Sequence, residues 1–213
     1  MIDNKKLKPI LEGYKKYFPL NFSGDNEEKY KWEAVKHFQD HWDIDAENFG
    51  EMFEMSTEKT YNLLASGYVY PRSMIINFAE VDDDTTRRMF RLWFDESKDL
   101  ALRVESFLAS AEEMRLKYGE GTWKNHYQNT NAISTYLWLR YPDKYYIYKY
   151  ELYKAAATEL DSDYIPKKNG LVENMIAGFK MYDEICDAII ADTDIPAMVQ
   201  AALTPDCYPD QKM

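Results

Sequence analysis

The sequence predicts a mainly α-helical protein, built as a multi-helix bundle or an orthogonal array of about eight helices, with room for one small β element near residues 145–148. Apolar residues recur at three- and four-residue steps through most of the 213 residues, which is the spacing that places side chains on one face of a helix. Glycine and proline number only 8 each, and 46% of the residues are hydrophobic. That composition is typical of a packed globular domain.

The N-terminal part of the chain predicts three helices. Apolar residues share one face over residues 7–18, and this helix is expected to end near Pro19. Asp25 and Glu28 have the spacing of a capping pair for a second helix. A third helix is expected over residues 45–67, with Asp45 as its cap.

The middle of the chain continues the helical pattern. The apolar stretch 74–78 suits either a helix or a buried strand. The three carboxylates of residues 82–84 directly precede an apolar helix pattern, so they fit its cap and first turn better than a metal site. A long helix follows over residues 100–118, and another over 131–141 that ends before Pro142.

The C-terminal part holds the clearest periodicity. Residues 145–148 are rich in tyrosine and suit a short strand or a loop, and a helix is expected over 150–160. Residues 172–190 form one apolar helix face that includes Cys186, which predicts a buried structural thiol. The predicted helical domain therefore covers residues 1–192, and the proline-containing segment 193–213 is expected to be a linker or the start of a further segment.

Charge and cysteine content narrow the classes of function. The formal net charge is -11, which does not suit a protein that coats nucleic acid nonspecifically through lysine and arginine. Two cysteines do not make a disulfide framework or a four-cysteine zinc site. Because no signal peptide or continuous apolar span is visible, a cytoplasmic location away from membranes is expected.

The motifs of common enzymes are missing from the sequence. No glycine begins a P-loop, a dinucleotide-binding loop or a nucleophile elbow. His37 and His41 are four residues apart and suit one helix face, but Phe38 stands where a zinc protease carries its catalytic glutamate. We therefore expect a noncatalytic chain without a cofactor or metal of its own, and a metal-dependent enzyme built on His37 and His41 stays as an alternative.

The segment 123–154 differs from the rest of the chain in its aromatic content and charge. Residues 121–170 carry seven basic and five acidic side chains, whereas residues 40–120 have a net charge of -9 and residues 171–213 of -6. Ten rings lie within the segment: Trp123, Tyr127, Tyr136, Trp138, Tyr141, Tyr145, Tyr146, Tyr148, Tyr150 and Tyr153.

Rings interleaved with cations suit three different roles. They stack on bases while the cations meet phosphates, they form protein interfaces, or they fill the junctions between helices. For the nucleic-acid role, the candidate contact residues are Trp123, Lys124, Arg140, Lys144, Tyr145, Tyr146 and Lys149.

The same segment carries a resemblance to a known family. The stretch Ala132-Ile133-Ser134-Thr135-Tyr136-Leu137-Trp138-Leu139-Arg140-Tyr141-Pro142-Asp143-Lys144-Tyr145-Tyr146-Ile147-Tyr148-Lys149 resembles the N-terminal regions of bacterial McrB-type AAA+ ATPases, the motor subunits of modification-dependent restriction systems. Trp123 with Asn125, and the segment 204–210, are also similar to that group.

The resemblance implies a place in a restriction system. In such proteins the N-terminal region recognises DNA, often at a modified base, ahead of the nucleotide-hydrolysing domain, and a separate nuclease subunit cuts. Since this chain lacks Walker motifs, it is expected to be the recognition portion of such a protein. The alternative is a protein-interaction or assembly domain that docks on the ATPase or on a partner subunit.

Overall fold

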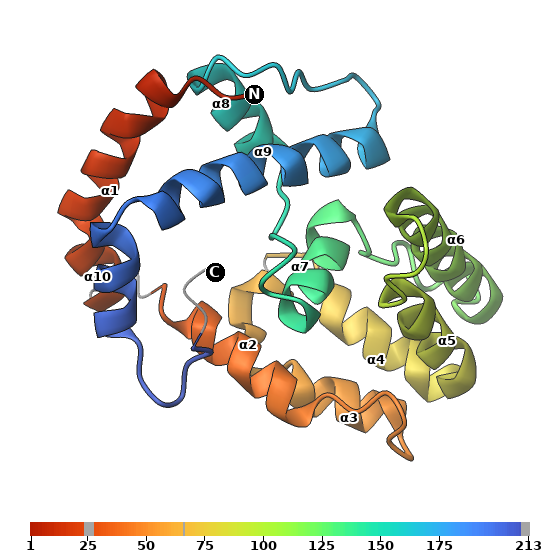
Figure 1. Cartoon of the computed structure of the whole chain (residues 1–213). Helices are drawn as coiled ribbons and strands as arrows, with labels where there is room; N and C mark the ends of the chain where they lie inside the picture. Colours follow the sequence, from red (N-terminus) through yellow and green to blue (C-terminus); the bar gives the residue numbers. More distant parts are fainter. Residues whose placement is uncertain (24–27, 66, 210–213) are drawn as a thin grey trace.

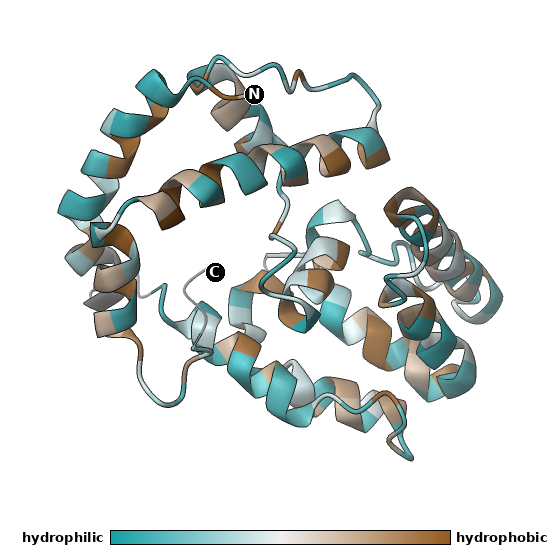
Figure 2. Ribbon diagram, in the orientation of Figure 1, coloured by the Kyte–Doolittle hydropathy of each residue, from teal (hydrophilic) through white to brown (hydrophobic). Residues whose placement is uncertain are grey.

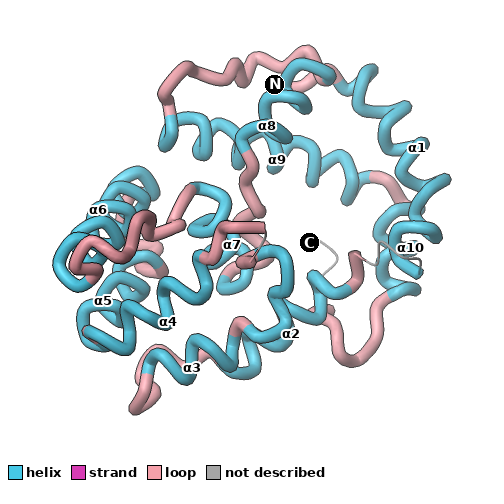
Figure 3. The backbone as a smooth tube through the Cα atoms, turned by 180° about the vertical axis from the view of Figure 1, so that it is seen from behind, coloured by secondary structure: helices cyan, strands magenta, loops and turns pink. Residues whose placement is uncertain are grey.

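Helices make up most of the chain (Figure 1) over residues 1–23, 28–65 and 67–209, the ranges that a computed structural model describes. In these ranges there is no β-strand, and Figure 3 shows only helices and loops. The mainly α fold class is therefore confirmed. The elements are α1 (Asn4–Ser23), α2 (Tyr30–His41), α3 (Phe49–Ser56), the 3-10 helix η1 (Glu58–Leu63), α4 (Pro71–Val81), α5 (Asp83–Trp93), α6 (Leu100–Tyr118), α7 (Thr130–Arg140), α8 (Tyr150–Glu159), α9 (Leu171–Ala191) and α10 (Asp194–Ala202).

The segment 145–148 is a loop, not the small β element that its composition allowed. Tyr145 and Tyr148 are both buried in the core. The backbone N–H of Tyr148 donates to the Ser134 hydroxyl at 2.8 Å. Because a side chain of α7 satisfies this donor, the segment needs no partner strand.

Several helix boundaries differ from those predicted. Helix α1 continues past Pro19 to Ser23, although a proline inside a helix removes one hydrogen bond and crowds the preceding turn. The expected third helix divides into α3 and η1, and Asn48, not Asp45, caps α3 by accepting a hydrogen bond from the Glu51 N–H. Asp25 of the predicted capping pair lies outside the described residues.

The structure shows the outcome of two sequence predictions near the middle of the chain, the element at residues 74–78 and the role of the carboxylates at 82–84. Residues 74–78 belong to α4. The Asp82 carboxylate accepts a hydrogen bond from the Thr85 N–H at 3.0 Å and so caps α5. The carboxylates 82–84 thus serve the helix terminus, as their position in the sequence predicts.

Helix α7 lies at the centre of the fold. Its residues 132–139 are all buried, a pattern expected only for a helix that is covered on every side. It contacts α2 and α9. In Figure 1, α5 and α6 lie at one end of the molecule and α1 and α10 at the other.

A cluster of aromatic rings joins the helices around α7. Phe90 on α5 is fully buried and its ring lies 5.3 Å from those of Phe53, Phe107 and Tyr136, measured between centroids. These rings come from α3, α6 and α7. Phe90 also contacts Trp42, Phe49 and Phe94.

A second, smaller cluster covers the ends of the chain. Ile195 and Val199 of α10 are buried with Phe18, Trp32 and Cys207. The sequence places this region in the segment 193–213, expected to be a linker, whereas the structure has a packed helix there. Pro196 hides that helix from sequence patterns, although a proline in the first turn lacks only a donor that has no partner there.

The longest helix, α9, confirms the amphipathic pattern of its sequence. Figure 2 shows hydrophobic and hydrophilic residues alternating along α9 and α1. Cys186 of α9 is buried and is not part of a disulfide. Among the described residues, no helix has the length and apolar character needed to cross a membrane.

Replacing Phe90 with alanine is expected to lower the free energy of unfolding by about 3–5 kcal/mol, because a fully buried ring is lost and a cavity remains. Denaturant titration followed by circular dichroism measures this change. The control is Leu116→Ala on α6, since Leu116 is 65% exposed and its loss is expected to cost under about 1 kcal/mol. Equal losses in the two variants would contradict the central role of the Phe90 cluster.

Candidate nucleic-acid interface

Most rings of the aromatic segment 123–154 lie in the core. Tyr136, Trp138, Tyr145, Tyr148 and Tyr153 are buried, and only Tyr150 is exposed. The remaining four rings, Trp123, Tyr127, Tyr141 and Tyr146, are partly buried and pack against the core. Packing between helices is therefore the main role of this segment.

Lys144 and Tyr145 belong to a network of charges that is partly buried. The Arg103 guanidinium, 3% exposed, donates to the Tyr145 hydroxyl at 2.8 Å and to the Trp93 carbonyl at 3.0 Å. The Tyr145 hydroxyl donates to the Glu96 carboxylate at 3.1 Å, and Lys144 forms an ion pair with the same carboxylate. Glu96 thus offsets the charge of Lys144 and faces the buried charge of Arg103.

Trp123 and Lys124 lie apart from Tyr145. The Trp123 ring packs 5.6 Å from the Phe78 ring, and its carbonyl accepts a hydrogen bond from Arg115 near the end of α6. Tyr145 instead contacts Arg103 near the start of α6, and these two arginines are twelve positions apart, or roughly 18 Å along the helix. The predicted contact residues therefore do not form one patch.

The remaining predicted cations lie at opposite ends of α7. Lys124 is exposed and donates to the Gly121 carbonyl at 2.6 Å. Arg140, at the C-terminal end of α7, lies 5.1 Å from the centroid of the Tyr141 ring. Lys149 lies at the other end, beside Asn129 and Asn131.

Tyr145 and Tyr146 line an aromatic pocket of about 250 Å³. Trp32 from α2, Trp138 from α7 and Tyr182 from α9 also line it, and Lys31 is the charged side chain of this lining. The Tyr146 hydroxyl donates to the Asp183 carboxylate at 2.9 Å. Burial raises the pKa of Tyr146 and raises that of Tyr182 to about 12, so both hydroxyls stay neutral at physiological pH.

A second, polar pocket of about 390 Å³ shares Lys31 with the aromatic pocket. The amide side chains of Asn62, Asn129 and Asn131 line it together with Lys149 and with Glu28, whose carboxylate forms an ion pair with Lys31. Amides offer both donors and acceptors. The two pockets and the two lysines define one surface, which we name the Lys31 face.

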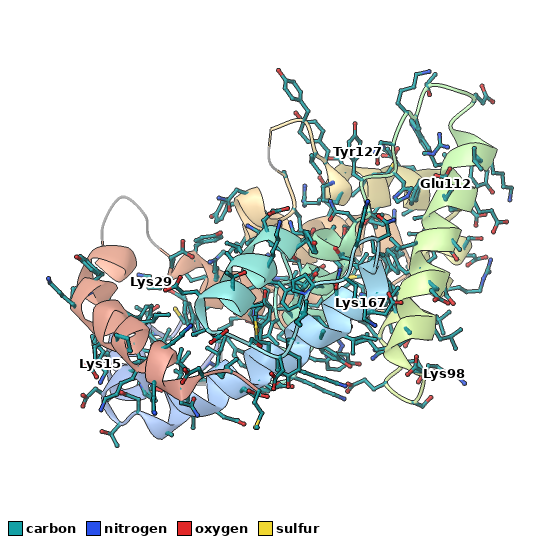
Figure 4. All side chains as sticks on the ribbon, turned by 90° about the horizontal axis from the view of Figure 1, so that it is seen from above. Lys15, Lys29, Lys98, Glu112, Tyr127 and Lys167 are labelled. Carbon is teal, nitrogen blue, oxygen red and sulfur yellow. The ribbon has the colours of Figure 1, made fainter. Side chains whose placement is uncertain are left out.

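Exposed tyrosines lie next to the Lys31 face, and the sequence reasoning did not select them. Tyr61 is 62% and Tyr68 is 90% exposed, and Tyr61 has φ of 41°, a conformation that a tyrosine rarely adopts. Tyr70 is also exposed and its ring lies 6.2 Å from that of Tyr127, which Figure 4 labels at the edge of the molecule near Glu112. A tyrosine pair between Gly67 and Pro71 is the available sequence signal, since glycine and proline mark exposed turns.

His37 and His41 stack with ring centroids 4.1 Å apart. His37 Nε2 donates to the Met55 carbonyl at 2.9 Å, and His41 Nδ1 donates to the His37 carbonyl at 2.8 Å. In the described ranges, no three His, Cys, Asp or Glu side chains are placed to hold a metal together. The pair thus stabilises the junction of α2 with α3.

Comparisons with known proteins identified no similar protein. No family model, curated protein or solved structure matches this chain.

Glu96→Gln is expected to lower the free energy of unfolding by about 1–2 kcal/mol at neutral pH, because hydrogen bonds with a charged partner weaken. Burial acts to raise the pKa of Glu96, but hydrogen bonds from Lys144 and Tyr145 outweigh it and lower that pKa from 4.5. A lowered folded-state pKa gives stability above the unfolded-state pKa, and that stability disappears as the pH falls through the folded-state pKa.

The difference between wild type and Glu96→Gln should therefore be full at neutral pH and shrink below about pH 4.5. Denaturant titrations across this range measure it. The control is Glu105→Gln on α6, an exposed position where little change is expected. A difference that stays constant with pH would contradict the proposed role of the Glu96 charge.

Proposed function

We propose that the chain is a noncatalytic DNA-recognition module, the N-terminal part of an McrB-like restriction ATPase. The observation that carries this proposal is the aromatic pocket, where five rings and Lys31 meet at one site. Rings stack on any base, and a neighbouring lysine suits the phosphate beside it.

The size of the aromatic pocket favours one planar ring as its occupant. Its volume of about 250 Å³ lies below the roughly 300–1,000 Å³ of pockets for drug-sized ligands. Tyr146 and Tyr182 are only partly buried, so their rings are accessible to a base. A base enters such a pocket only when it is unpaired, so single strands and distorted duplexes are the expected ligands.

In this proposal, the contact residues predicted from the sequence have different roles at the Lys31 face. Tyr145 and Tyr146 contact the base, and Lys149 with Lys31 contacts the DNA backbone across the polar pocket. Lys144 lies 5.5 Å from the centroid of the Tyr145 ring and Arg140 lies 5.1 Å from that of Tyr141, but neither cation lines the aromatic pocket. Trp123 and Lys124 have no part in this contact, since they lie near the other end of α6.

A second candidate function is a protein-interaction domain for the ATPase or nuclease subunit. Exposure of Tyr61, Tyr68 and Tyr70 in one loop region favours it, because tyrosine is enriched at protein interfaces. This candidate predicts a complex that is insensitive to salt and no binding of oligonucleotides.

Tyr146→Ala is expected to weaken binding of a single-stranded oligonucleotide by about 5- to 150-fold, because it removes the stacking free energy of one base. Fluorescence anisotropy at low salt measures it, with single-stranded, matched-duplex and mismatched or base-modified duplex probes. Tyr146→Phe keeps the ring and should bind like wild type. Tyr17→Ala is the second control, because Tyr17 is 53% exposed and lines neither the aromatic pocket nor the polar pocket. No binding by wild type at low salt would overturn the DNA proposal.

Lys31→Ala and Lys149→Ala are each expected to reduce the slope of log K against log salt by roughly 1, because each removes one phosphate contact. The measurement is the same anisotropy titration over a salt series. Lys8→Ala on α1 is the control, since Lys8 is exposed as Lys149 is and lines neither pocket of the Lys31 face. Equal slopes in all three variants would remove the Lys31 face from the DNA contact.

A further inference from the structure

A large open groove of about 1,040 Å³ lies between α3, α4 and the loop 43–48. Its floor is apolar: Met52 and Ala79 are buried there, Ile76 is partly buried and Met55 is 49% exposed. Gly50 keeps α3 close to α4 in this floor, since a Cβ at that position would lie 3.1 Å from the Ala79 Cβ. None of the side chains of the Lys31 face lines this groove.

The rim of the groove carries only negative charge. Asp43, Glu47, Glu51 and Glu80 are exposed and form no ion pair with any residue in the described part of the chain. Two further rim carboxylates are already paired, Asp83 with Arg87 at 2.7 Å and Glu54 with Arg72 at 3.8 Å. Like charges around an open groove repel one another, and a cationic occupant relieves this repulsion.

We infer that this groove docks a basic amphipathic helix of a partner protein. An apolar stripe of such a helix covers Met55 and Ile76, while its lysines and arginines meet the rim carboxylates. Exposed methionine adapts to varied apolar side chains. The separate cations of a helix fit this rim better than one metal ion, since within the described ranges no three acidic, His or Cys side chains converge.

The negative charge of the rim makes this groove unsuitable for DNA, so it is a different site from the Lys31 face. Phosphate backbones are repelled by the same carboxylates that attract the helix. The inference therefore stands whether or not the Lys31 face binds DNA, and the two are tested with different probes.

The test uses a fluorescein-labelled synthetic peptide of lysine and leucine in helical amphipathic spacing, with a scrambled peptide of the same composition. The triple variant Glu47→Gln, Glu51→Gln, Glu80→Gln is expected to weaken binding of the amphipathic peptide about tenfold in anisotropy titrations. Met55→Ser should reduce the preference for the amphipathic over the scrambled peptide. Circular dichroism of each variant checks that the fold is kept.

The matched control is Glu105→Gln, Glu113→Gln, Glu120→Gln, which removes the same charge from exposed positions in and just after α6. This control should change peptide binding less than about threefold. The inference is overturned if both triple variants weaken binding equally, or if wild type binds the scrambled peptide as well as the amphipathic one.

Discussion

The fold depends on the buried contact of Phe90 with the rings around it. Phe53, Phe107 and Tyr136 bring α3, α6 and α7 to one point on α5. Tilted and edge-to-face ring pairs favour particular geometries, so this cluster fixes the angles between helices as well as burying apolar area.

The cluster also determines which aromatic rings are accessible to a ligand. Phe53, Phe107 and Tyr136 are buried against Phe90, whereas the partly buried Tyr146 and Tyr182 line the aromatic pocket near α7 and α9.

The same arrangement separates the charges of the molecule. Basic side chains of α6 turn inward or pair locally, as Arg103 does with Tyr145 and Arg115 with Glu112. The carboxylates around α3 and α4 lack such partners in much of the groove rim. In the proposed DNA complex, an overall charge of -11 would limit the contact to a few phosphates at the Lys31 face. The proposal therefore requires that affinity for a base come mainly from stacking, since few counterions would be released.

Sequence patterns predicted the helices wherever burial follows a local period. The carboxylates 82–84 were correctly assigned to a helix terminus because a cap acts within three residues. Helix α10 was missed because its two buried residues lie in a short segment rich in proline.

The candidate site could be predicted only in part from the sequence. Tyr145 and Tyr146 line the aromatic pocket as predicted contact residues, but Lys31 and Trp32, which also line it, lie more than a hundred residues earlier. The pairing of Lys144 with Glu96 is equally nonlocal, so no spacing rule reveals that its charge is already partnered.

The stretch 132–149, on which the proposed restriction role depends, lies mostly in the core. Residues 132–139 are buried on every side of α7, so packing of this central helix explains their apolar and aromatic character. Trp138 and Tyr145 belong to this core and also line the aromatic pocket. Any substitution at these two positions changes the fold and the pocket together. Tyr146 differs because it is only partly buried and its hydroxyl bonds to Asp183 at the protein surface. Among the residues that line the aromatic pocket, Tyr146 is therefore a position where the proposed stacking on a base is tested with less effect on the core.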